Sequence, residues 1–390
     1  MKKINGFVLV LLLLAFICTA FISGQEAYAS ENEGGFTAGG FKYEISDEEK
    51  HQVVLKGFDE NGTGDEEYRT NVEIPAKVVV DEVEYTVKAI ADAAFAMSDI
   101  ETVIVSEGIK KIGDSAFSGC SKLKRIELPS TLTGLGNAVF SYCSALDDVV
   151  INDDSESFIY IKGLLSSIDL DVLYWASDYI NHSLTLPEKT VRIMPYAFEG
   201  NSVLKKIVLN DGLTTIGAGA FFDCPLLERA DISATVSKIE GNPFMYCTSL
   251  KKIKVASGNT VYSSTKTGLL LNYKKTVLIS ASAADSELTV PSKVKTIGRG
   301  AAAGNTKLTG IIFDEKLKTV NEYAFADCTG LSKVSFSNRK AVLAENGQIF
   351  KNAQYFMEVS IPYSEKAGAD GSIEAMVRNN SPKGVIITSR

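Results

Sequence analysis

Apolar and polar residues alternate along this chain in a block that recurs many times. In the copy at residues 112–128, Ile-Gly precedes Ala-Phe, a Cys follows the Phe by three residues, and Leu-x-x-Ile-x-Leu begins three residues later. The last Ile and Leu alternate with one polar residue, which is typical of a strand with one buried face. One block cannot bury its own apolar face, so the pattern predicts coils that stack on their neighbours.

The phenylalanine of this block, here called the anchor, is spaced on two scales. Phe117 and Phe140 are 23 residues apart, and Phe221 follows Phe117 by 104 residues. The short period indicates a stacked array, and the long one indicates that several coils were duplicated as one block. At the same offset of 104, Ala302 stands where the earlier block has Phe198. We expect that coil to be thinner or locally loose, because a missing ring removes core contacts.

Each coil is predicted to hold a strand, a second short extended stretch and a corner that contains the anchor. We expect the corner to be a short helical or 3₁₀ segment with the Phe as its wedge. Two segments, at about 152–184 and 257–288, interrupt the array. Each shows two β segments around a polar turn, so we expect a hairpin insert that widens one coil.

These patterns divide the chain into four parts. The predicted parts are a signal peptide at 1–29, a β-rich N-terminal cap at 30–88, the repeat solenoid at 89–336, and a degenerate repeat with a C-terminal cap at 337–390. Within the last part we expect a short helix at 372–380.

The first residues have the organisation of a signal peptide. Lys2 and Lys3 give a positive start, residues 7–22 are largely apolar, and Ala27 and Ala29 are the small residues that a signal peptidase reads. We expect cleavage after Ala29 and a secreted or cell-surface product. The alternative is an uncleaved membrane anchor, although the apolar run falls short of the roughly 20 residues of a comfortable span.

The cysteines of the array share one position of the repeat, three residues after the anchor. They are Cys120, Cys143, Cys224, Cys247 and Cys328. An odd number cannot be fully paired within one chain, and free cysteine packs as a compact apolar residue, so we favour free buried thiols. A disulfide Cys120–Cys143 or Cys224–Cys247 stays open, since stacked coils lie about 4.8 Å apart, within the range of bridged Cα atoms.

Charge and histidine content limit the classes of function. The chain has 48 Asp and Glu against 40 Lys and Arg, a net charge of −8 at pH 7. Nucleic acid and anionic lipid attract concentrated positive charge, so we expect neither as the main partner. The two histidines, His51 and His182, make a histidine-based metal centre unexpected. We predict no catalytic residue, metal or cofactor.

Two short motifs imitate functional sites. Ser263 and Lys266, followed by Thr267-Gly268, imitate motifs of serine β-lactamases. Here they share one predicted strand, whose side chains point alternately to opposite faces, so we interpret the match as coincidence. Residues 59–65 imitate the front of a calcium loop, but Thr70 stands where a bidentate Glu is needed. A solvated acidic turn is the better interpretation.

Five residues are candidates for contact with a partner, namely Trp175, Tyr174, Lys251, Lys252 and Lys254. Trp175 is the only tryptophan, and on an exposed hairpin it would contribute strongly to an interface. The alternative is an aromatic plug that seals the hairpin against the solenoid. The lysines belong to stripes of charge on outward strand positions, which suit a protein or glycan partner but which solubility also explains.

The block from Ile112 to Pro129, Ile-Gly-x-x-Ala-Phe-x-x-Cys-x-x-Leu-x-x-Ile-x-Leu-Pro, resembles the leucine-rich repeat of BspA-like surface proteins. The likeness covers roughly residues 89–336. It implies a leucine-rich repeat solenoid and an exported bacterial protein. Some members of that family are implicated in adhesion and in binding host or matrix proteins. It implies no catalytic residues.

We therefore expect an exported bacterial interaction protein that binds protein or glycan partners, with adhesion to a host or its matrix included. One alternative is a structural protein that binds the envelope of the producing cell. A hydrolase sited in an insert is less favoured, because the sequence holds no Ser/His/Asp set, no zinc-ligand spacing and no phosphate loop.

Overall fold

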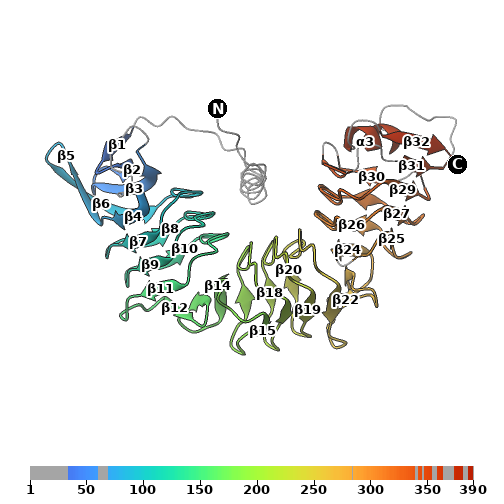
Figure 1. Ribbon diagram of the computed structural model, residues 1–390, viewed down its shortest axis with the longest axis horizontal. Helices are drawn as coiled ribbons and strands as arrows, with labels where there is room; N and C mark the ends of the chain where they lie inside the picture. The colour runs from blue at the N-terminus through green and yellow to red at the C-terminus, as the bar shows by residue number, and fades with distance from the viewer. Residues whose placement is uncertain are drawn as a thin grey trace. The chain divides into compact units, whose positions relative to one another are not determined.

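The computed structural model shows stacked β coils (Figure 1). It describes residues 34–59, 69–282, 284–338, 341–344, 347–353, 358–362, 373–380 and 385–389. The predicted signal peptide at 1–29 and all of the predicted acidic turn except Asp59 lie outside these residues. The chain divides into two compact units between Glu156 and Ser157, which we call unit 1 and unit 2 and describe separately.

Unit 1 contains two sheets, which we call sheet A and sheet B. Sheet A consists of β1 (Gly35–Ala38), β2 (Phe41–Asp47), β3 (Gln52–Phe58), β5 (Lys77–Val80), β6 (Val83–Ile90), β8 (Lys111–Ile112) and β10 (Gly134–Leu135). Sheet B consists of β4 (Asn71–Ile74), β7 (Thr102–Val105), β9 (Arg125–Leu128) and β11 (Asp148–Ile151). Strands β1 to β3 are antiparallel, whereas β3, β6, β8 and β10 pair in parallel.

Unit 2 repeats this arrangement in sheets C to F. Sheet C consists of β12 (Phe158–Ile161), β13 (Leu164–Ser167), β14 (Val172–Ala176), β16 (Arg192–Ile193), β18 (Thr215–Ile216) and β20 (Lys238–Ile239). Sheet D consists of β15 (Ser183–Thr185), β17 (Lys206–Val208), β19 (Arg229–Ile232) and β21 (Lys252–Val255).

Sheet E begins with the strands of the second insert, and sheet F comes after them. Sheet E consists of β22 (Tyr262–Ser264), β23 (Leu270–Asn272), β24 (Val277–Ser280), β26 (Thr296–Ile297), β28 (Thr319–Val320) and β30 (Val342–Leu343). Sheet F consists of β25 (Glu287–Thr289), β27 (Gly310–Phe313), β29 (Lys333–Phe336), β31 (Glu358–Ile361) and β32 (Ile386–Ser389), and helix α3 (Ile373–Asn380) precedes β32. Each regular coil thus gives one two-residue strand to one sheet and one longer strand to another, which confirms the predicted β-rich solenoid.

The corners differ from the prediction. They are turns, whereas helical or 3₁₀ segments were expected. In the coil of Phe117, Ser115 and Gly119 have φ angles of 57° and 77°, which a right-handed helix does not contain. The N–H groups of Ser115, Phe117 and Gly119 donate to carbonyls of the next coil at 2.8, 3.1 and 2.7 Å. A helix would use such donors internally, so the turn is the conformation that lets neighbouring coils pair.

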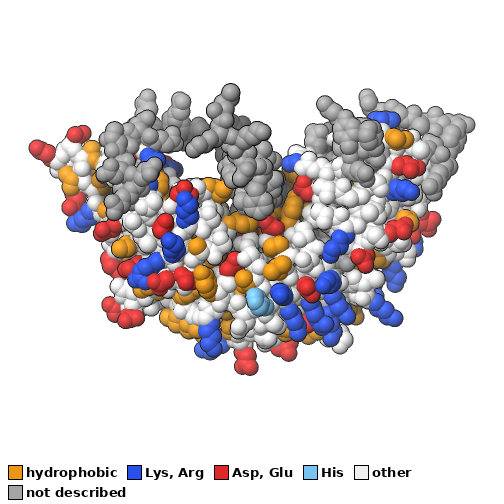
Figure 2. All heavy atoms as spheres, in the orientation of Figure 1, with side chains coloured by type: hydrophobic (Ala, Val, Ile, Leu, Met, Phe, Trp, Pro, Cys, Tyr) orange, Lys and Arg blue, Asp and Glu red, His pale blue; other side chains and the backbone are white. Residues whose placement is uncertain are grey.

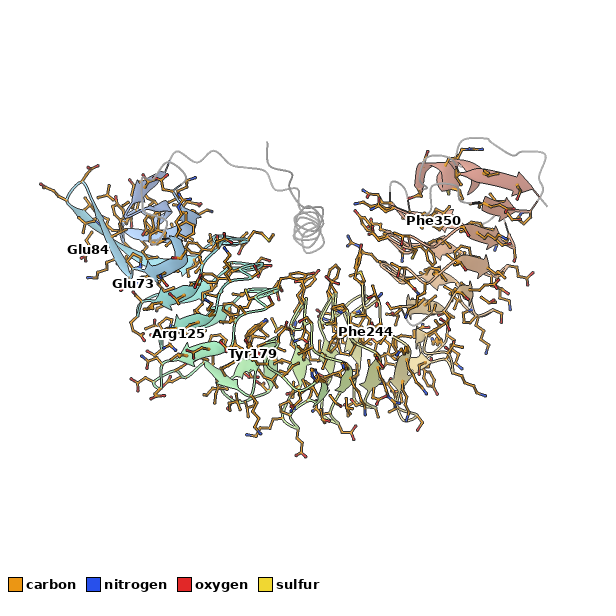
Figure 3. All side chains as sticks on the ribbon, viewed as in Figure 1. Glu73, Glu84, Arg125, Tyr179, Phe244 and Phe350 are labelled. Atoms are coloured by element: carbon orange, nitrogen blue, oxygen red, sulfur yellow. The ribbon has the colours of Figure 1, made fainter. Side chains whose placement is uncertain are left out.

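The anchor rings stack inside each unit. In unit 2, the ring centroids of Phe198 and Phe221 are 4.8 Å apart and those of Phe221 and Phe244 are 5.3 Å apart, with the planes within 22°. All three side chains are fully buried, and Figure 3 labels Phe244. Stacked aromatic pairs add about 0.5–1.5 kcal/mol beyond the burial of their area. In unit 1 the same stack is formed by Phe95, Phe117 and Phe140.

Ala302 interrupts the stack of rings, yet its coil is closed. Ala302 is fully buried, and its N–H donates to the carbonyl of Ala324 at 2.7 Å. Phe313 stands at the strand end where the preceding block has Leu209, and its ring packs edge-on against Phe325 at 5.8 Å between centroids. The coil is therefore closed rather than locally loose, and a larger residue of the same coil, Phe313, adds a ring beside Phe325.

The cysteines are free and buried, as favoured from the sequence. The Cys224 thiol donates to the carbonyl of Phe198 at 3.0 Å, and the Cys120 thiol donates to that of Phe95 at 3.1 Å. The slot therefore serves to satisfy the carbonyl of the preceding anchor.

Two coils hold asparagine in this slot, and both follow an insert. The Asn201 amide donates to the carbonyl of Ser177 at 2.9 Å and to that of Ala176 at 3.5 Å. Asn305 donates to Ala284 at 2.9 Å and to a second carbonyl of the other insert at 3.4 Å. A thiol has one hydrogen to donate and an amide has two, so Asn fits where the insert backbone presents two carbonyls.

Each insert contains three strands, whereas the sequence predicted two. β12, β13 and β14 pair antiparallel in the first insert, and β22, β23 and β24 do so in the second. The additional turn of the first insert is Lys162-Gly163, whose φ angles are 52° and 81°. Positive φ at both central residues is the geometry of a tight two-residue hairpin turn. The sequence did not indicate this turn, because Lys stands at the first central position, where Asn, Asp or Gly is usual. The limits of the inserts and of the other predicted domains stay predictions.

The ends of the array carry closing contacts. In unit 1, the rings of Phe41 and Phe58 pack edge-on against Phe95 at 6.1 and 5.0 Å. In unit 2, the carbonyl of Asn380 in α3 accepts from the N–H of Phe350 at 2.9 Å. Helix α3 confirms the short helix expected there, and it bonds to Phe350, whose ring stacks on that of Phe325 at 5.8 Å between centroids.

Candidate interaction surface

Sheet D carries a row of like charges on its outward face. The parallel register aligns Lys206 with Arg229 and Arg229 with Lys252. The residue that follows each of them is fully buried, so the three charged side chains leave the sheet on the opposite, outer face. Neighbouring strands lie about 4.8 Å apart, and the fold therefore holds three cationic side chains side by side.

Three further lysines extend this row. Lys205 and Lys251 immediately precede β17 and β21, and Lys254 is the next outward residue after Lys252. Figure 2 shows Lys and Arg side chains gathered over the region between β19 and β22. We call the six residues the basic strip, which comprises Lys205, Lys206, Arg229, Lys251, Lys252 and Lys254.

Acidic side chains of the same sheet compensate two of the six charges. Lys251 Nζ lies 3.1 Å from Glu228 Oε2. Arg229 Nε donates to the two carboxylate oxygens of Asp231 at 2.9 and 3.0 Å. Within the described residues, no ion pair involves the remaining four lysines. The strip thus presents four ammonium groups that form no ion pair among the described residues, one of them, Lys254, opposite Asp231 in the strand register, on a chain with a net charge of −8.

Sheet B of unit 1 shows the opposite arrangement, in which charges of adjacent coils neutralise one another. Lys124 Nζ lies 2.7 Å from Glu101 Oε2. Arg125, labelled in Figure 3, pairs with Glu127 at 2.8 Å and also with Asp148. Exposed pairs of this kind contribute about 0–1 kcal/mol each, so solubility and cross-strand pairing explain the charges of sheet B.

Sheet F shows that the fold does not require a basic row. At the offset of 104 residues, Gly310 and Lys333 occupy the positions of Lys206 and Arg229, and the register continues from Lys333 to Glu358. Like charges directly opposite each other destabilise a sheet. Packing therefore does not explain the basic strip, and local departures of this kind are typical of functional surfaces.

A shallow hollow of about 710 Å³ adjoins the strip where the strands of sheet D end. Lys254 and Asp231 belong to its lining, as do Glu188 and Asp211. Asn210 also lines it, and its amide donates to the backbone carbonyl of Glu188 at 3.0 Å. The hollow thus places hydrogen-bond acceptors beside the cations of the strip.

The predicted aromatic contacts lie elsewhere. Trp175 on β14 is only 5% exposed and stacks on Tyr160 at 6.3 Å between ring centroids. Tyr174 is half-buried, packs edge-on against Phe158 at 5.2 Å, and has its hydroxyl pKa raised by burial. Trp175 has the placement of an aromatic plug and offers little surface to a partner. The structure therefore brings Lys251, Lys252 and Lys254 together on sheet D, while the two aromatic residues lie on sheet C.

The sequence placed Lys205, Lys206 and Arg229 in the stripes of charge, but only Lys251, Lys252 and Lys254 were predicted as candidate contacts. A signal was present, because Lys206, Arg229 and Lys252 are spaced by 23 residues. This spacing equals the coil period, and residues one period apart occupy equivalent places on adjacent coils. Charges should therefore be compared between coils, as well as along each strand.

Other candidate chemistry is not assembled in the part of the chain that the structure describes. No group of three or more His, Cys, Asp and Glu is placed there to hold a metal ion. Ser263 lies on β22 and Lys266 in the turn after it, so the two do not share a strand as predicted. Burial raises the pKa of the Cys120 thiol to about 12, which suppresses the nucleophilic thiolate. No helix among the described residues has the length and apolar character to cross a membrane.

Comparison with known proteins identifies the repeat. The profile of the BspA type leucine-rich repeat region matches six copies in this chain, at residues 81–162, 173–267 and 281–372. These segments make up more than half of the chain. No curated protein matches it.

Solved structures with similar repeats come from several bacteria. A leucine-rich cell surface protein from Faecalibacterium prausnitzii gives a TM-score of 0.43 at 19% identity, over 93% of this chain and 96% of that chain. A leucine-rich repeat protein from Eubacterium ventriosum gives 0.42 at 18% identity, over 84% of this chain and 77% of that chain. The pneumococcal vaccine antigen PcpA gives 0.35 at 15% identity, over 92% and 98%.

Proposed function

Since this chain belongs to the BspA-type leucine-rich repeat family, we propose that it is an exported interaction protein whose sheet D binds a macromolecular partner. The signal peptide predicted at 1–29 would direct export, with cleavage after Ala29. A partner on a host cell or in its matrix would make the protein an adhesin. Stacked repeats suit this role, because they present extended, regular surfaces.

One observation carries the proposal, namely the in-register row of Lys206, Arg229 and Lys252. Keeping like charges side by side costs folding stability. A partner with complementary charge offsets that cost when it binds, and electrostatic complementarity also raises the rate of association. The predicted contacts Lys251, Lys252 and Lys254 belong to this surface. Trp175 does not, because its ring is buried.

A pull-down with the protein that begins at Ser30 tests the proposal. Three baits, namely the wild-type chain, a Lys206→Glu/Lys252→Glu variant and a Lys333→Glu variant, are compared against host matrix extract and against envelope of the producing cell. We expect enrichment of a partner on the wild-type chain and its loss on the variant. Lys333→Glu, at the equivalent of Arg229 on sheet F, is the matched control and should retain the partner. Equal capture by all three chains would contradict a role for sheet D.

A further inference from the structure

We infer that the basic strip binds a linear anionic polysaccharide, a single chain of sugars that carry carboxylate or sulfate groups. This inference rests on the proposed function of sheet D and specifies the chemistry of its partner. It is drawn from four features of the face, which are the line of cations, the absence of apolar anchors on it, its narrow width, and the acceptors in the adjoining hollow.

The cations form a line across the strands. Lys206, Arg229 and Lys252 repeat at the spacing of the sheet, about 4.8 Å. Lys205 and Lys251 flank the line one residue earlier. A linear polymer with a regular charge presents anions along one direction, so a single extended chain can lie along this row and contact several cations at once.

A protein partner fits this face less well. Cores of protein–protein interfaces are enriched in aromatic residues and Arg and depleted of Lys, whereas five of the six residues of the strip are lysines. Its one arginine already directs Nε at Asp231. The outward residue of β17 beside the strip is Val208, and β15 contributes Ser183 and Thr185. The face therefore offers charge and hydroxyls, and no aromatic anchor.

Nucleic acid fits less well for two reasons. Binding of single strands relies on bases that stack on aromatic side chains, which the outward face of sheet D lacks. A duplex is wider than the row and would lie over its acidic surroundings, which include Glu188 and Asp211. A single polysaccharide chain is narrow enough to follow the lysines alone.

The adjoining hollow supplies what a sugar needs in addition to cations. Glu188, Asp211 and Asp231 line it with carboxylates, and Thr185 adds a hydroxyl. Carboxylates accept hydrogen bonds, and sugar hydroxyls donate them. Because Lys254 belongs to both the strip and the hollow, one sugar can be held by its charge on the strip and by its hydroxyls in the hollow.

Equilibrium binding to defined polymers tests the inference. The protein that begins at Ser30 is titrated, at several salt concentrations, with heparin as a sulfated chain and with polygalacturonate as a carboxylated one. We expect binding of at least one of them, weakened by salt because the charges are exposed. Lys206→Glu/Lys252→Glu should weaken it by about tenfold or more, since it removes two exposed ion pairs and adds two repulsions. Lys333→Glu should change it less than about twofold.

Each outcome separates the two levels of the proposal. Binding of heparin alone, or of polygalacturonate alone, supports the inference and identifies the anion. Failure to bind either polymer, equal affinity of the double variant, or tighter binding of polyglutamate or single-stranded DNA overturns it. If the pull-down still captures a protein that the double variant loses, the proposed function of sheet D stands and only the polysaccharide is wrong. The variants are first compared by circular dichroism, and the double variant should unfold at no lower temperature than wild type, because it relieves like-charge repulsion.

Discussion

At the scale of single residues, the anchor rings are the units that hold one coil to the next. Phe221 is fully buried and contacts a ring on each side, at 4.8 and 5.3 Å. Phe221→Ala removes both contacts and leaves a cavity that the turns cannot fill. We expect a loss of about 3–5 kcal/mol in the free energy of unfolding, measured by urea denaturation. The control is Leu226→Ala, whose side chain is 42% exposed and should cost less than about 0.5 kcal/mol.

Ala302 and Phe313 should behave as a compensating pair. Ala302→Phe alone inserts a ring into a closed core and is expected to cost about 1–3 kcal/mol. Phe313→Leu alone leaves a void beside Phe325. The double variant restores the combination of Phe198 and Leu209 in the preceding block, so its cost should fall below the sum of the single costs. A double-mutant cycle with a coupling below about 0.5 kcal/mol would contradict this pairing.

The buried thiols predict how the protein responds to alkaline pH. Burial raises the pKa of Cys120 to about 12 and also raises the pKa of Cys143, Cys224 and Cys328. An unfolded cysteine titrates near a pKa of about 8.5. Because the folded value is the higher one, the contribution to stability is complete below about pH 8.5 and is lost as the pH rises toward the folded value.

Two measurements check the thiol prediction. At pH 8, a colorimetric disulfide reagent should label almost no thiol of the folded chain that begins at Ser30, and five after unfolding in urea. The free energy of unfolding should decline above about pH 9. Replacement of Cys120 by Ala should make that decline shallower. Rapid labelling of the folded chain would show that the slot is open to solvent.

At the scale of elements, one buried asparagine adds side-chain hydrogen bonds between each insert and the coil that follows it. The Asn201 side-chain oxygen accepts from the N–H of Leu204 at 2.9 Å, and its amide donates to Ser177 at 2.9 Å. Asn201→Ala leaves these buried groups without partners, so we expect a loss of about 2–4 kcal/mol. Asn201→Cys introduces the residue that other coils use and should recover part of it. Urea denaturation checks both, with exposed Lys189→Ala as the control.

The same elements show how far the sequence could be read. The inward residues of β9, such as Ile126 and Leu128, follow from alternation, since only one face of the strand is buried. The corners and the tight turn at Lys162-Gly163 could not be predicted, because they depend on positive φ at residues such as Ser115 and Lys162. Residues other than Gly hold such angles only where the surrounding structure offsets the cost.

At the scale of the whole molecule, the candidate surface was only partly predictable. Lys251, Lys252 and Lys254 could be named from the sequence of one coil. The row that contains them is formed by residues of three adjacent coils, and it becomes visible only when the coils are compared. Trp175 illustrates the opposite limit. As the only tryptophan it is a natural candidate for a contact. Its burial, however, depends on Leu165 of the adjacent strand β13 and on Tyr160 of β12, and the turn at Lys162-Gly163 brings these two strands together. Whether Trp175 is an exposed contact or a buried plug therefore depends on one turn that the sequence pattern does not reveal.

The division into two units predicts local rather than global loss of structure. In a stacked array each coil contacts only its neighbours, and the described chain separates between Glu156 and Ser157. Phe117→Ala, in the ring stack of unit 1, removes about 3–5 kcal/mol of core packing. We expect amide hydrogens of β8 to β11 to exchange at least about a hundredfold faster, while those of sheet D keep their protection. Phe221→Ala should give the reciprocal pattern. Hydrogen exchange followed by mass spectrometry checks both, and equal acceleration in both units by either variant would mean that the array opens as one cooperative body.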